Sequence, residues 1–315
     1  MNNAVLKSAG VNQVFLSEVV AGLGRMPKAL SPKWFYDHRG SQLFEQITHL
    51  PEYYPTRTEI DLLEHIVASL SEALADRRVL IEYGSGSSRK TRLLLRAMPE
   101  LTHYVPMDVS AEFLRGAADG LSKQFPNVQV RPLVGDFNVA LKIPPELREL
   151  SSLGFFPGST IGNLTPAKAS EFLRLRRGEL GEGGELLIGV DLRKPTDVLL
   201  AAYDDSAGVT AAFNRNLLTR INEELGADFD PERFDHQARW NDEYGRVEMH
   251  LVSRGAQTVR VGEHRFEFAD GESIHSENSH KYRIGEFKLL ARASGWDVRQ
   301  LWTDDKQWFG VFLLG

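Results

Sequence analysis

The 315-residue chain contains no cysteine. This absence excludes disulfide scaffolds, thiolate zinc sites and cysteine nucleophiles. The chain also lacks a run of about eighteen apolar residues, the length that a membrane-spanning helix needs. Residues 1–20 carry one lysine and no continuous apolar stretch before Glu18, which is not the pattern of a signal peptide. We therefore expect a cytoplasmic protein with no membrane partner.

A surplus of positive charge is absent as well. The 37 Lys and Arg residues are outnumbered by 43 Asp and Glu, for a formal net charge of −6. A nucleic-acid groove would need basic residues gathered on one face, so we expect no nucleic-acid partner. No long apolar stripe remains once a core is assigned, which favours a monomer.

Short apolar runs alternate with helical stretches from residue 78 to residue 191. The first run, Val79–Ile81, ends in Glu82-Tyr83-Gly84-Ser85-Gly86 and is followed by an amphipathic segment, the pattern of strand, tight turn and helix. Further strands are expected at residues 103–107, 128–134, 153–156 and 186–190. This rhythm predicts an α/β fold, a doubly wound parallel sheet with helices on both faces.

The alternation of expected strands and helices ends after Asp191. A helix is expected at 214–225, followed by β-like alternation at 246–252 and 257–261, before a helix at 284–293 and a closing hairpin at 296–303 and 308–314. We expect an insertion into the sheet domain. The predicted organisation is an N-terminal segment (1–59) packing with the insertion, a core (60–194), an inserted substrate-binding domain (195–282) and a return to the core (283–315).

The expected strand ends carry residues suited to a nucleoside ligand, which open α/β sheets bind at their carboxyl edge. Gly84 and Gly86 allow a tight turn and close approach of the backbone. Asp108 is placed to accept hydrogen bonds from both ribose hydroxyls, and Asp136 beside Phe137 to meet an adenine amino group.

Two alternatives remain at this point. The glycines can be a plain strand-to-helix turn, and Asp108 or Ser110 can simply cap the next helix. A dinucleotide such as NAD is disfavoured, since Gly86 is followed by Ser87-Ser88-Arg89-Lys90 and a third glycine is missing. A sulfonium ligand, which has no phosphate to bind, suits the motif better.

Four blocks of sequence are long and unusual. The blocks are Ser31-Pro32-Lys33-Trp34-Phe35-Tyr36-Asp37 with Gly40-Ser41-Gln42-Leu43-Phe44, Leu50-Pro51-Glu52-Tyr53-Tyr54-Pro55-Thr56-Arg57, Gly158-Ser159-Thr160-Ile161-Gly162-Asn163-Leu164-Thr165-Pro166, and Tyr203-Asp204-Asp205 with Thr210 and Phe213-Asn214-Arg215-Asn216. Together they resemble a known family, the histidine-specific α-N-methyltransferases of ergothioneine biosynthesis, which trimethylate histidine to hercynine. The similarity runs from about Leu30 to the C-terminus.

The resemblance implies a Rossmann-like class I methyltransferase sheet and a second, smaller α+β substrate domain, with the substrate pocket between them. It implies S-adenosyl-L-methionine as cofactor and histidine as substrate. The implied cofactor-binding residues are Phe44, Gly84, Gly86, Lys90, Asp108, Asp136 and Phe137. The implied substrate contacts are Asn163, Tyr203 and Gly158 at the carboxylate, Tyr36 and Tyr53 at the amine, and Glu277, Ser279 and Met249 at the imidazole.

The chemistry is consistent with these residue types. Methyl transfer from a sulfonium is an in-line displacement that needs orientation rather than a metal or a triad. Tyr36 is the expected catalytic residue, orienting the amine and relaying its proton, and the many aromatics suit a quaternary ammonium product. No metal site is expected, since the nine histidines form no His-x-His or His-Glu-x-x-His pattern.

Other functions stay open on the sequence alone. Asn278 and His280 flank Ser279 where the family has smaller or apolar residues, so another amino acid, a methylhistidine or an aromatic one, is an alternative substrate. A non-catalytic protein that binds S-adenosylmethionine has the same fold, which by itself does not decide function.

Overall fold

The computed structural model describes residues 2–86, 89–109, 111–141 and 143–315. The chain divides into two compact units. We call residues 1–53 and 195–279 the insertion unit, and residues 54–194 and 280–315 the sheet unit. The division after residue 53 precedes helix α3 (Tyr54–Ala73), which runs across the limit expected at residue 59.

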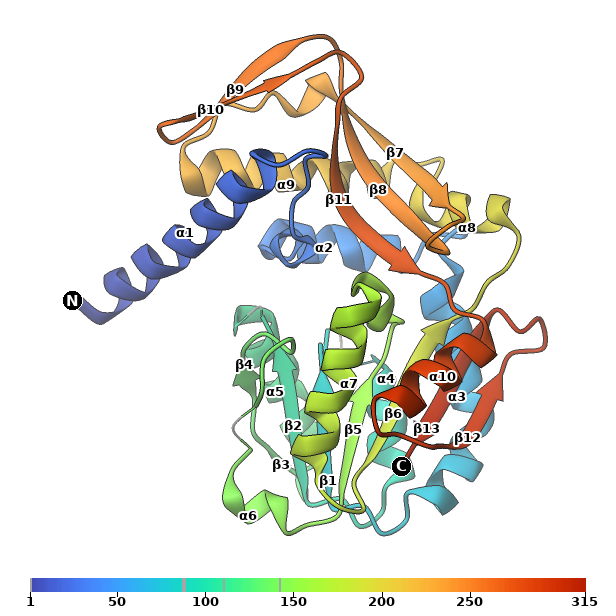
Figure 1. The fold of residues 1–315 in the computed structure, drawn as a ribbon. Coiled ribbons are helices and arrows are strands. Elements are labelled where there is room, and N and C mark those ends of the chain that lie inside the picture. Colours follow the sequence, from blue (N-terminus) through green and yellow to red (C-terminus); the bar gives the residue numbers. More distant parts are fainter. Residues whose placement is uncertain (1, 87–88, 110, 142) are drawn as a thin grey trace. The chain divides into compact units, whose positions relative to one another are not determined.

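The sheet unit is built on one mixed sheet of eight strands with the order β12-β13-β6-β5-β1-β2-β3, in which β4 also pairs with β2 (Figure 1). Strands β1 to β6 are joined in parallel, whereas β13 runs antiparallel to β6 and β12 antiparallel to β13. The doubly wound α/β prediction is confirmed. The strands are β1 (Val79–Tyr83), β2 (His103–Asp108), β3 (Gln129–Val130), β4 (Leu133–Val134), β5 (Ser152–Phe156), β6 (Glu185–Asp191), β12 (Val298–Thr303) and β13 (Phe309–Leu314).

The expectation of one continuous strand at 128–134 is wrong. The structure has two short strands there, β3 and β4, separated by Arg131 and Pro132. Because proline has no backbone N–H to donate, it interrupts the ladder on this edge of the sheet. The hairpin expected at the C-terminus is present as β12 and β13.

Helices cover both faces of the sheet, as apolar runs buried on both sides require. One core layer lies under α6, α7 and α10, and the other lies under α3, α4 and α5. Strands β1, β5 and β13 are buried along their whole length. The helices are α3, α4 (Arg89–Ala97), α5 (Ala111–Gln124), α6 (Pro145–Arg148), α7 (Pro166–Leu180) and α10 (Ile284–Ala293), with the 3-10 helix η2 (Thr160–Asn163).

The strand order reverses beside β1. From β1 the chain proceeds to β2 on one side, while β5 lies on the other side. In open α/β sheets, a crevice forms at the carboxyl end of the strand where the order reverses. The turn after Tyr83 is at that position.

A buried carboxylate, Asp191, joins distant parts of the sheet unit. Its Oδ2 accepts hydrogen bonds of 2.7 Å from the Tyr54 hydroxyl and from Lys281 Nζ, and its Oδ1 pairs with Lys194. Burial alone would raise the pKa of Asp191, but Lys281 and Lys194 hold it below its usual range. Burial in turn lowers the pKa of Lys194 to about 8, against the opposing effect of Asp191.

The insertion unit combines helices with two small antiparallel sheets, β11-β8-β7 and β10-β9. Helices α1, α2 and η1 pack against α9. Helix α9 begins at Val209, five residues before the start expected, because both oxygens of Asp205 cap its first turn by accepting the N–H groups of Val209 (2.9 Å) and Thr210 (2.7 Å). The elements are α1 (Asn2–Leu23), η1 (Pro32–Phe35), α2 (His38–Ile47), α8 (Thr196–Tyr203), α9 (Val209–Leu225), η3 (Pro231–Arg233), β7 (Phe234–Asn241), β8 (Arg246–Ser253), β9 (Gln257–Val261), β10 (His264–Phe268) and β11 (Ser273–His280).

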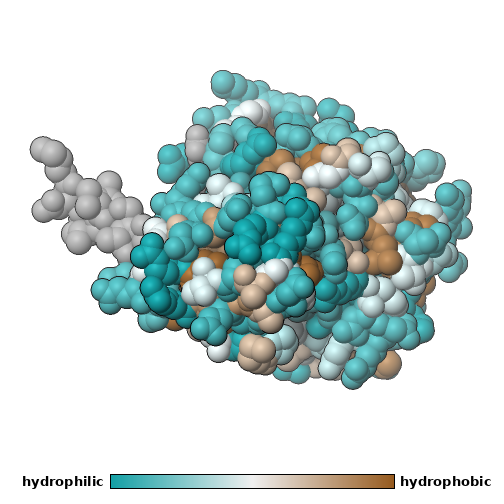
Figure 2. Space-filling view, turned by 90° about the horizontal axis from the view of Figure 1, so that it is seen from above, coloured by the Kyte–Doolittle hydropathy of each residue, from teal (hydrophilic) through white to brown (hydrophobic). Residues whose placement is uncertain are grey.

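The surface carries hydrophilic residues with apolar ones scattered among them on the face drawn in Figure 2. Within the described residues, the structure contains no helix with the length and apolar character needed to cross a membrane.

Gly189 on β6 tests how tightly the sheet packs against α3. A Cβ at this position would lie 2.0 Å from Glu59 Oε1, a buried carboxylate oxygen. We expect Gly189→Ala to lower the free energy of unfolding in urea by about 1–3 kcal/mol, because it displaces a packed polar group. The matched control is Gly178→Ala on the exposed side of α7, where a Cβ meets nothing within 4 Å. It should raise stability by roughly 0.5–1 kcal/mol through helix propensity. Equal effects of the two substitutions would contradict this packing.

Candidate functional site

The turn after β1 is shaped by its glycines. Gly84 has φ 76° and Gly86 has φ 46°, both in the left-handed region that glycine adopts without steric cost. The N–H groups of Gly84 and Ser85 both donate to the carbonyl of Met107, at 2.9 and 3.0 Å. The turn is thereby fixed to the end of β2, and Gly84 and Gly86 present no Cβ to an approaching ligand.

Asp108 belongs to the same turn. It ends β2, and its Oδ2 accepts the N–H of Gly86 at 3.3 Å. The structure therefore brings Gly84, Gly86 and Asp108 together at the carboxyl edge, while the ribose contact of Asp108 stays a prediction. The alternative capping residue, Ser110, lies outside the described residues.

Glu82, the acid of the same motif, points into the protein. Its Oε2 accepts hydrogen bonds from the hydroxyls of Thr91 (2.7 Å) and Tyr104, and the side chain is buried. Burial raises the pKa of Glu82 to about 7. Glu82 thus holds β1, β2 and α4 together beneath the turn.

Phe137 and Asp136 follow β4. A Cβ on Gly84 would lie 3.9 Å from the Phe137 ring, so the ring borders the glycine turn. Phe137 packs edge-on against Phe156 with ring centroids 5.3 Å apart. Asp136 Oδ1 accepts both N–H (2.8 Å) and Nδ2–H (2.7 Å) of Asn138, which fixes its loop. Its contact with adenine stays a prediction.

Lys90 and Gly158 meet at an acid that the sequence analysis did not identify. Glu59 on α3 pairs with Lys90 Nζ and accepts the N–H of Gly158 at 3.0 and 2.8 Å. Glu59 is fully buried. A signal was present: Glu59 lies three and four residues before Leu62 and Leu63, on the apolar face of its helix, where an acid needs a specific partner.

Asn163 ends η2, in the segment that follows β5. The backbone of this segment is bent at Gly158 and Ser159, with φ 78° and 54°. The Ser159 hydroxyl accepts the N–H of Asp191 at 2.8 Å, and His280 Nδ1 donates to the Gly162 carbonyl at 2.9 Å. The segment is therefore held at both ends, which fixes the backbone that carries Asn163.

In the insertion unit, the predicted aromatic residues form one continuous cluster. Ring centroids are 5.7 Å apart for Tyr36 and Phe44, 6.3 Å for Phe44 and Tyr53, and 6.2 Å for Tyr53 and Tyr203. Phe213 on α9 adds a further wall, 5.9 Å from Tyr36 and 6.0 Å from Phe44. Residues from three separate sequence blocks thus come together.

Local contacts position Tyr36 at the start of this cluster. The next residue, Asp37, caps α2 by accepting the N–H of Gly40 at 2.5 Å and is also bonded by Asn216 Nδ2 at 3.0 Å. A Cβ on Gly40 would lie 1.7 Å from the Phe35 carbonyl oxygen, so only glycine fits there. This contact explains the glycine of the first block.

Tyr203 and Ser279 are joined directly, with their hydroxyl oxygens 2.6 Å apart. His236 Nε2 donates to the Tyr203 carbonyl at 2.7 Å, and Asn214 Nδ2 donates to His236 Nδ1 at 2.8 Å. The acceptor carbonyl places a proton on Nε2, and Nδ1 accepts from the Asn214 amide, so this histidine is neutral. Burial lowers the pKa of His236.

Met249 and Glu277 lie on neighbouring strands, β8 and β11, and both side chains are buried. Ser276 joins the strands to α9, since its hydroxyl contacts the Met249 carbonyl (3.0 Å) and Asn214 Oδ1 (2.7 Å). Their imidazole contacts stay predictions. On the same sheet the structure gathers Glu248, His250 and His275, a group that the sequence analysis did not anticipate.

His236 gives a pH prediction. Because the pKa of His236 is lowered in the fold, the unfolded chain takes up its proton first, and stability falls as the pH drops below about 6.5. We expect His236→Gln, which keeps a donor toward the Tyr203 carbonyl but does not titrate, to lose less stability between pH 7 and pH 5 than the wild type. The measurement is the urea midpoint at each pH. The exposed His264→Gln is the control and should leave the wild-type slope unchanged. An unchanged slope in His236→Gln would contradict the assignment.

The sequence matches a family of known proteins over nearly its whole length. Residues 15–315 match the family model described as histidine-specific methyltransferase, SAM-dependent. The chain is 47% identical over 302 residues to a histidine N-alpha-methyltransferase of Mycolicibacterium smegmatis, covering 94% of this chain and 93% of that protein. It is 45% identical over 303 residues to the protein of the same name from Mycobacterium tuberculosis, with the same coverage.

The fold has a solved counterpart. A crystal structure of an S-adenosylmethionine-dependent methyltransferase from Clostridium acetobutylicum aligns with a TM-score of 0.51 at 13% identity, covering 87% of this chain and 97% of that one. At this identity the likeness concerns the fold, and it agrees with the Rossmann-like sheet. The match of residues 15–315 to the family model and the 47% identity over 94% of the chain show that the chain belongs to the histidine-specific, S-adenosylmethionine-dependent methyltransferase family.

Proposed function

We propose that the protein transfers three methyl groups from S-adenosyl-L-methionine to the α-amino group of L-histidine, giving hercynine, the first step of ergothioneine biosynthesis. The observation that carries the proposal is the identity of 47% over 94% of the chain to a histidine N-alpha-methyltransferase. The pathway is supported by an ergothioneine biosynthesis protein 1 of Schizosaccharomyces pombe, 29% identical over 280 residues, which cover 82% of this chain and 36% of that protein.

The turn after β1 is the proposed cofactor site. Gly84 and Gly86 carry no Cβ at the turn, Asp108 beside them is proposed to bind the ribose, and Asp136 and Phe137 are proposed to border the adenine. The remaining proposed contacts are Lys90 and Phe44. The ion pair of Lys90 with Glu59 supports a cationic ligand, because an unpaired ammonium nearby would repel the sulfonium.

Tyr203, Asn163 and Gly158 are the proposed contacts of the substrate carboxylate. Two hydrogen bonds hold Tyr203 in place for this role. His236 Nε2 donates to its backbone carbonyl, and its hydroxyl is hydrogen-bonded to the Ser279 hydroxyl. A hydroxyl held in this way needs little reorganisation when a carboxylate binds, which favours binding.

The amine is the reacting group, and the aromatic cluster is proposed to receive it. The bound cofactor supplies the methyl group as an electrophile. Tyr36 and Tyr53 would orient the neutral amine through their hydroxyls and relay its proton to water. As methyl groups accumulate, the faces of Tyr36, Phe44 and Phe213 attract the growing quaternary ammonium.

Glu277 is the proposed determinant of histidine specificity, with Ser279 beside it and Met249 lining the ring. A buried carboxylate that accepts an imidazole N–H forms a charge-assisted bond, which a side chain without a donor cannot make. We further propose that the enzyme is a cytoplasmic monomer acting on a small molecule, with no nucleic-acid or membrane partner, in agreement with its acidic composition.

Mass spectrometry of histidine incubated with the purified protein and S-adenosylmethionine tests the reaction. We expect products with one, two and three added methyl groups, ending at the trimethylated form. Binding of the cofactor without any product from histidine or other amino acids would favour the non-catalytic alternative. Product from an aromatic amino acid or a methylhistidine, but not from histidine, would favour the other substrate class.

The substitution Glu277→Ala tests the substrate assignment. We expect kcat/KM for histidine to fall by a factor of about 10² or more, since a charged hydrogen bond of roughly 3 kcal/mol is lost. Cofactor affinity, measured by calorimetry with S-adenosylhomocysteine, should stay unchanged. The matched control is Glu267→Ala on the exposed side of β10, which should leave kcat/KM at the wild-type value. Wild-type kcat/KM in Glu277→Ala would contradict the role of Glu277.

A further inference from the structure

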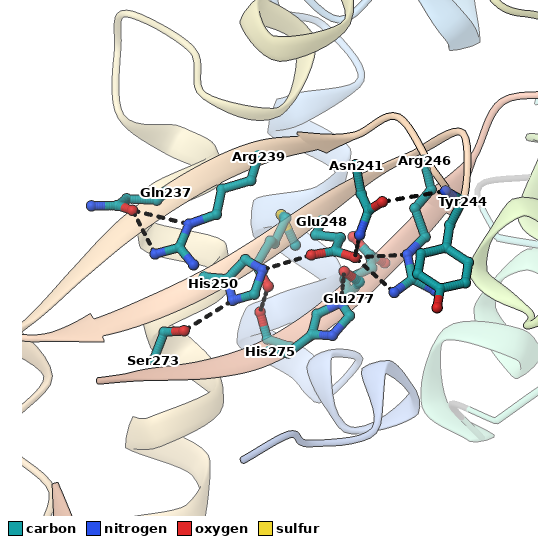
Figure 3. Close-up of polar contacts among 12 residues, drawn as sticks. Gln237, Arg239, Asn241, Tyr244, Arg246, Glu248, His250, Ser273, His275 and Glu277 are labelled. Atoms are coloured by element: carbon teal, nitrogen blue, oxygen red, sulfur yellow. Dashed lines mark hydrogen bonds and ion pairs between the residues drawn. The ribbon is translucent and has the colours of Figure 1, made fainter. Parts of the chain in front are cut away.

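Three potential metal ligands converge on the sheet β11-β8-β7 (Figure 3). Glu248 and His250 stand two residues apart on β8, and strand alternation places both side chains on one face. His275 comes from the neighbouring strand β11. One carboxylate oxygen and one ring nitrogen from each histidine lie within 4.8 Å of one another.

The carboxylate of Glu248 accepts hydrogen bonds at both oxygens. Its Oε1 accepts Asn241 Nδ2 at 2.9 Å and Arg246 Nε at 2.8 Å. Its Oε2 accepts the N–H of His250 Nε2 at 3.1 Å. The first oxygen is therefore anchored, and the second is directed to the histidines.

Each imidazole is also fixed through one of its nitrogens. His275 Nε2 donates to the Glu277 carbonyl at 2.9 Å, so the lone pair of neutral His275 is on Nδ1. His250 Nδ1 is 3.2 Å from the Ser273 hydroxyl, which leaves Nε2 to face Glu248. The two rings stack with centroids 4.8 Å apart and an angle of 17° between their planes.

This arrangement is the one that metal-binding histidines show. A ligating imidazole commonly donates its other N–H to a carbonyl, hydroxyl or carboxylate, which fixes the ring and its tautomer. Glu248 and His250 are 9% and 7% exposed and His275 is half-buried, so the group suits a small ion rather than a larger ligand. We propose that Glu248, His250 and His275 bind one Zn²⁺ ion, with a water molecule as the fourth ligand.

The chemistry of the ligands favours zinc over calcium or magnesium. Two imidazole nitrogens and one carboxylate oxygen are ligands that Zn²⁺ accepts, whereas Ca²⁺ and Mg²⁺ prefer oxygen alone. Bonds of about 2.0–2.2 Å require ligand atoms roughly 3.3 Å apart. The contact between Glu248 and His250 already meets this spacing. Zinc binding needs the Nε2 proton of His250 to move to Nδ1, where the Ser273 hydroxyl accepts it, and His275 to move inward.

Zinc titration of the full chain in a non-chelating buffer, without histidine, tests the proposal. Competition with a chromophoric zinc chelator should show one equivalent bound, and zinc should raise the thermal unfolding midpoint. His275→Gln should weaken zinc binding at least tenfold and abolish the rise in midpoint. The control His264→Gln, an exposed histidine on β10, should bind as the wild type.

The outcomes are separable from those of the enzymatic assay, since neither measurement uses substrate or cofactor. Circular dichroism of each variant without zinc shows whether it is folded. If His275→Gln does not fold, Glu248→Gln takes its place, with the same loss of affinity expected. The proposal is overturned if the wild type binds no zinc at micromolar concentrations, or if a folded variant binds zinc as tightly as the wild type.

Discussion

The sheet unit depends on the buried carboxylate of Asp191. Tyr54 is the first residue of this unit, Lys194 is the last residue before the insertion, and Lys281 is the second residue after it. All three bond to Asp191. Burying these charges costs several kcal/mol per ion unless each is paired. The cluster therefore ties the chain to β6 at each point where it enters or leaves the unit.

The two units carry complementary chemistry. The sheet unit presents glycines and Asp108 at the reversal of strand order, with Lys90 neutralised by Glu59. The insertion unit presents a cluster of aromatic rings and the hydrogen-bonded pair of Tyr203 and Ser279. A polar, open turn suits a nucleoside, and aromatic faces suit an amine that becomes a quaternary cation.

Much of this organisation followed from local sequence. The parallel sheet was predictable because each strand is an apolar run ended by glycine or aspartate, and α10 and β9 have the bounds expected. Glu59 and Asp191 were not assigned roles, since all their named partners except Lys194 lie 31 to 137 residues away. The group of Glu248, His250 and His275 was missed because a search for His-x-His ignores a carboxylate on the same strand face and a histidine on the next strand.

The position of methylation tests the central claim most directly. Histidine is incubated with the protein and S-adenosylmethionine carrying a ¹³C-labelled methyl group, and the product is examined by nuclear magnetic resonance. The account predicts three equivalent labelled methyl groups that correlate with the α-carbon of histidine. Labelled methyl groups on a ring nitrogen, with none on the α-nitrogen, would contradict it.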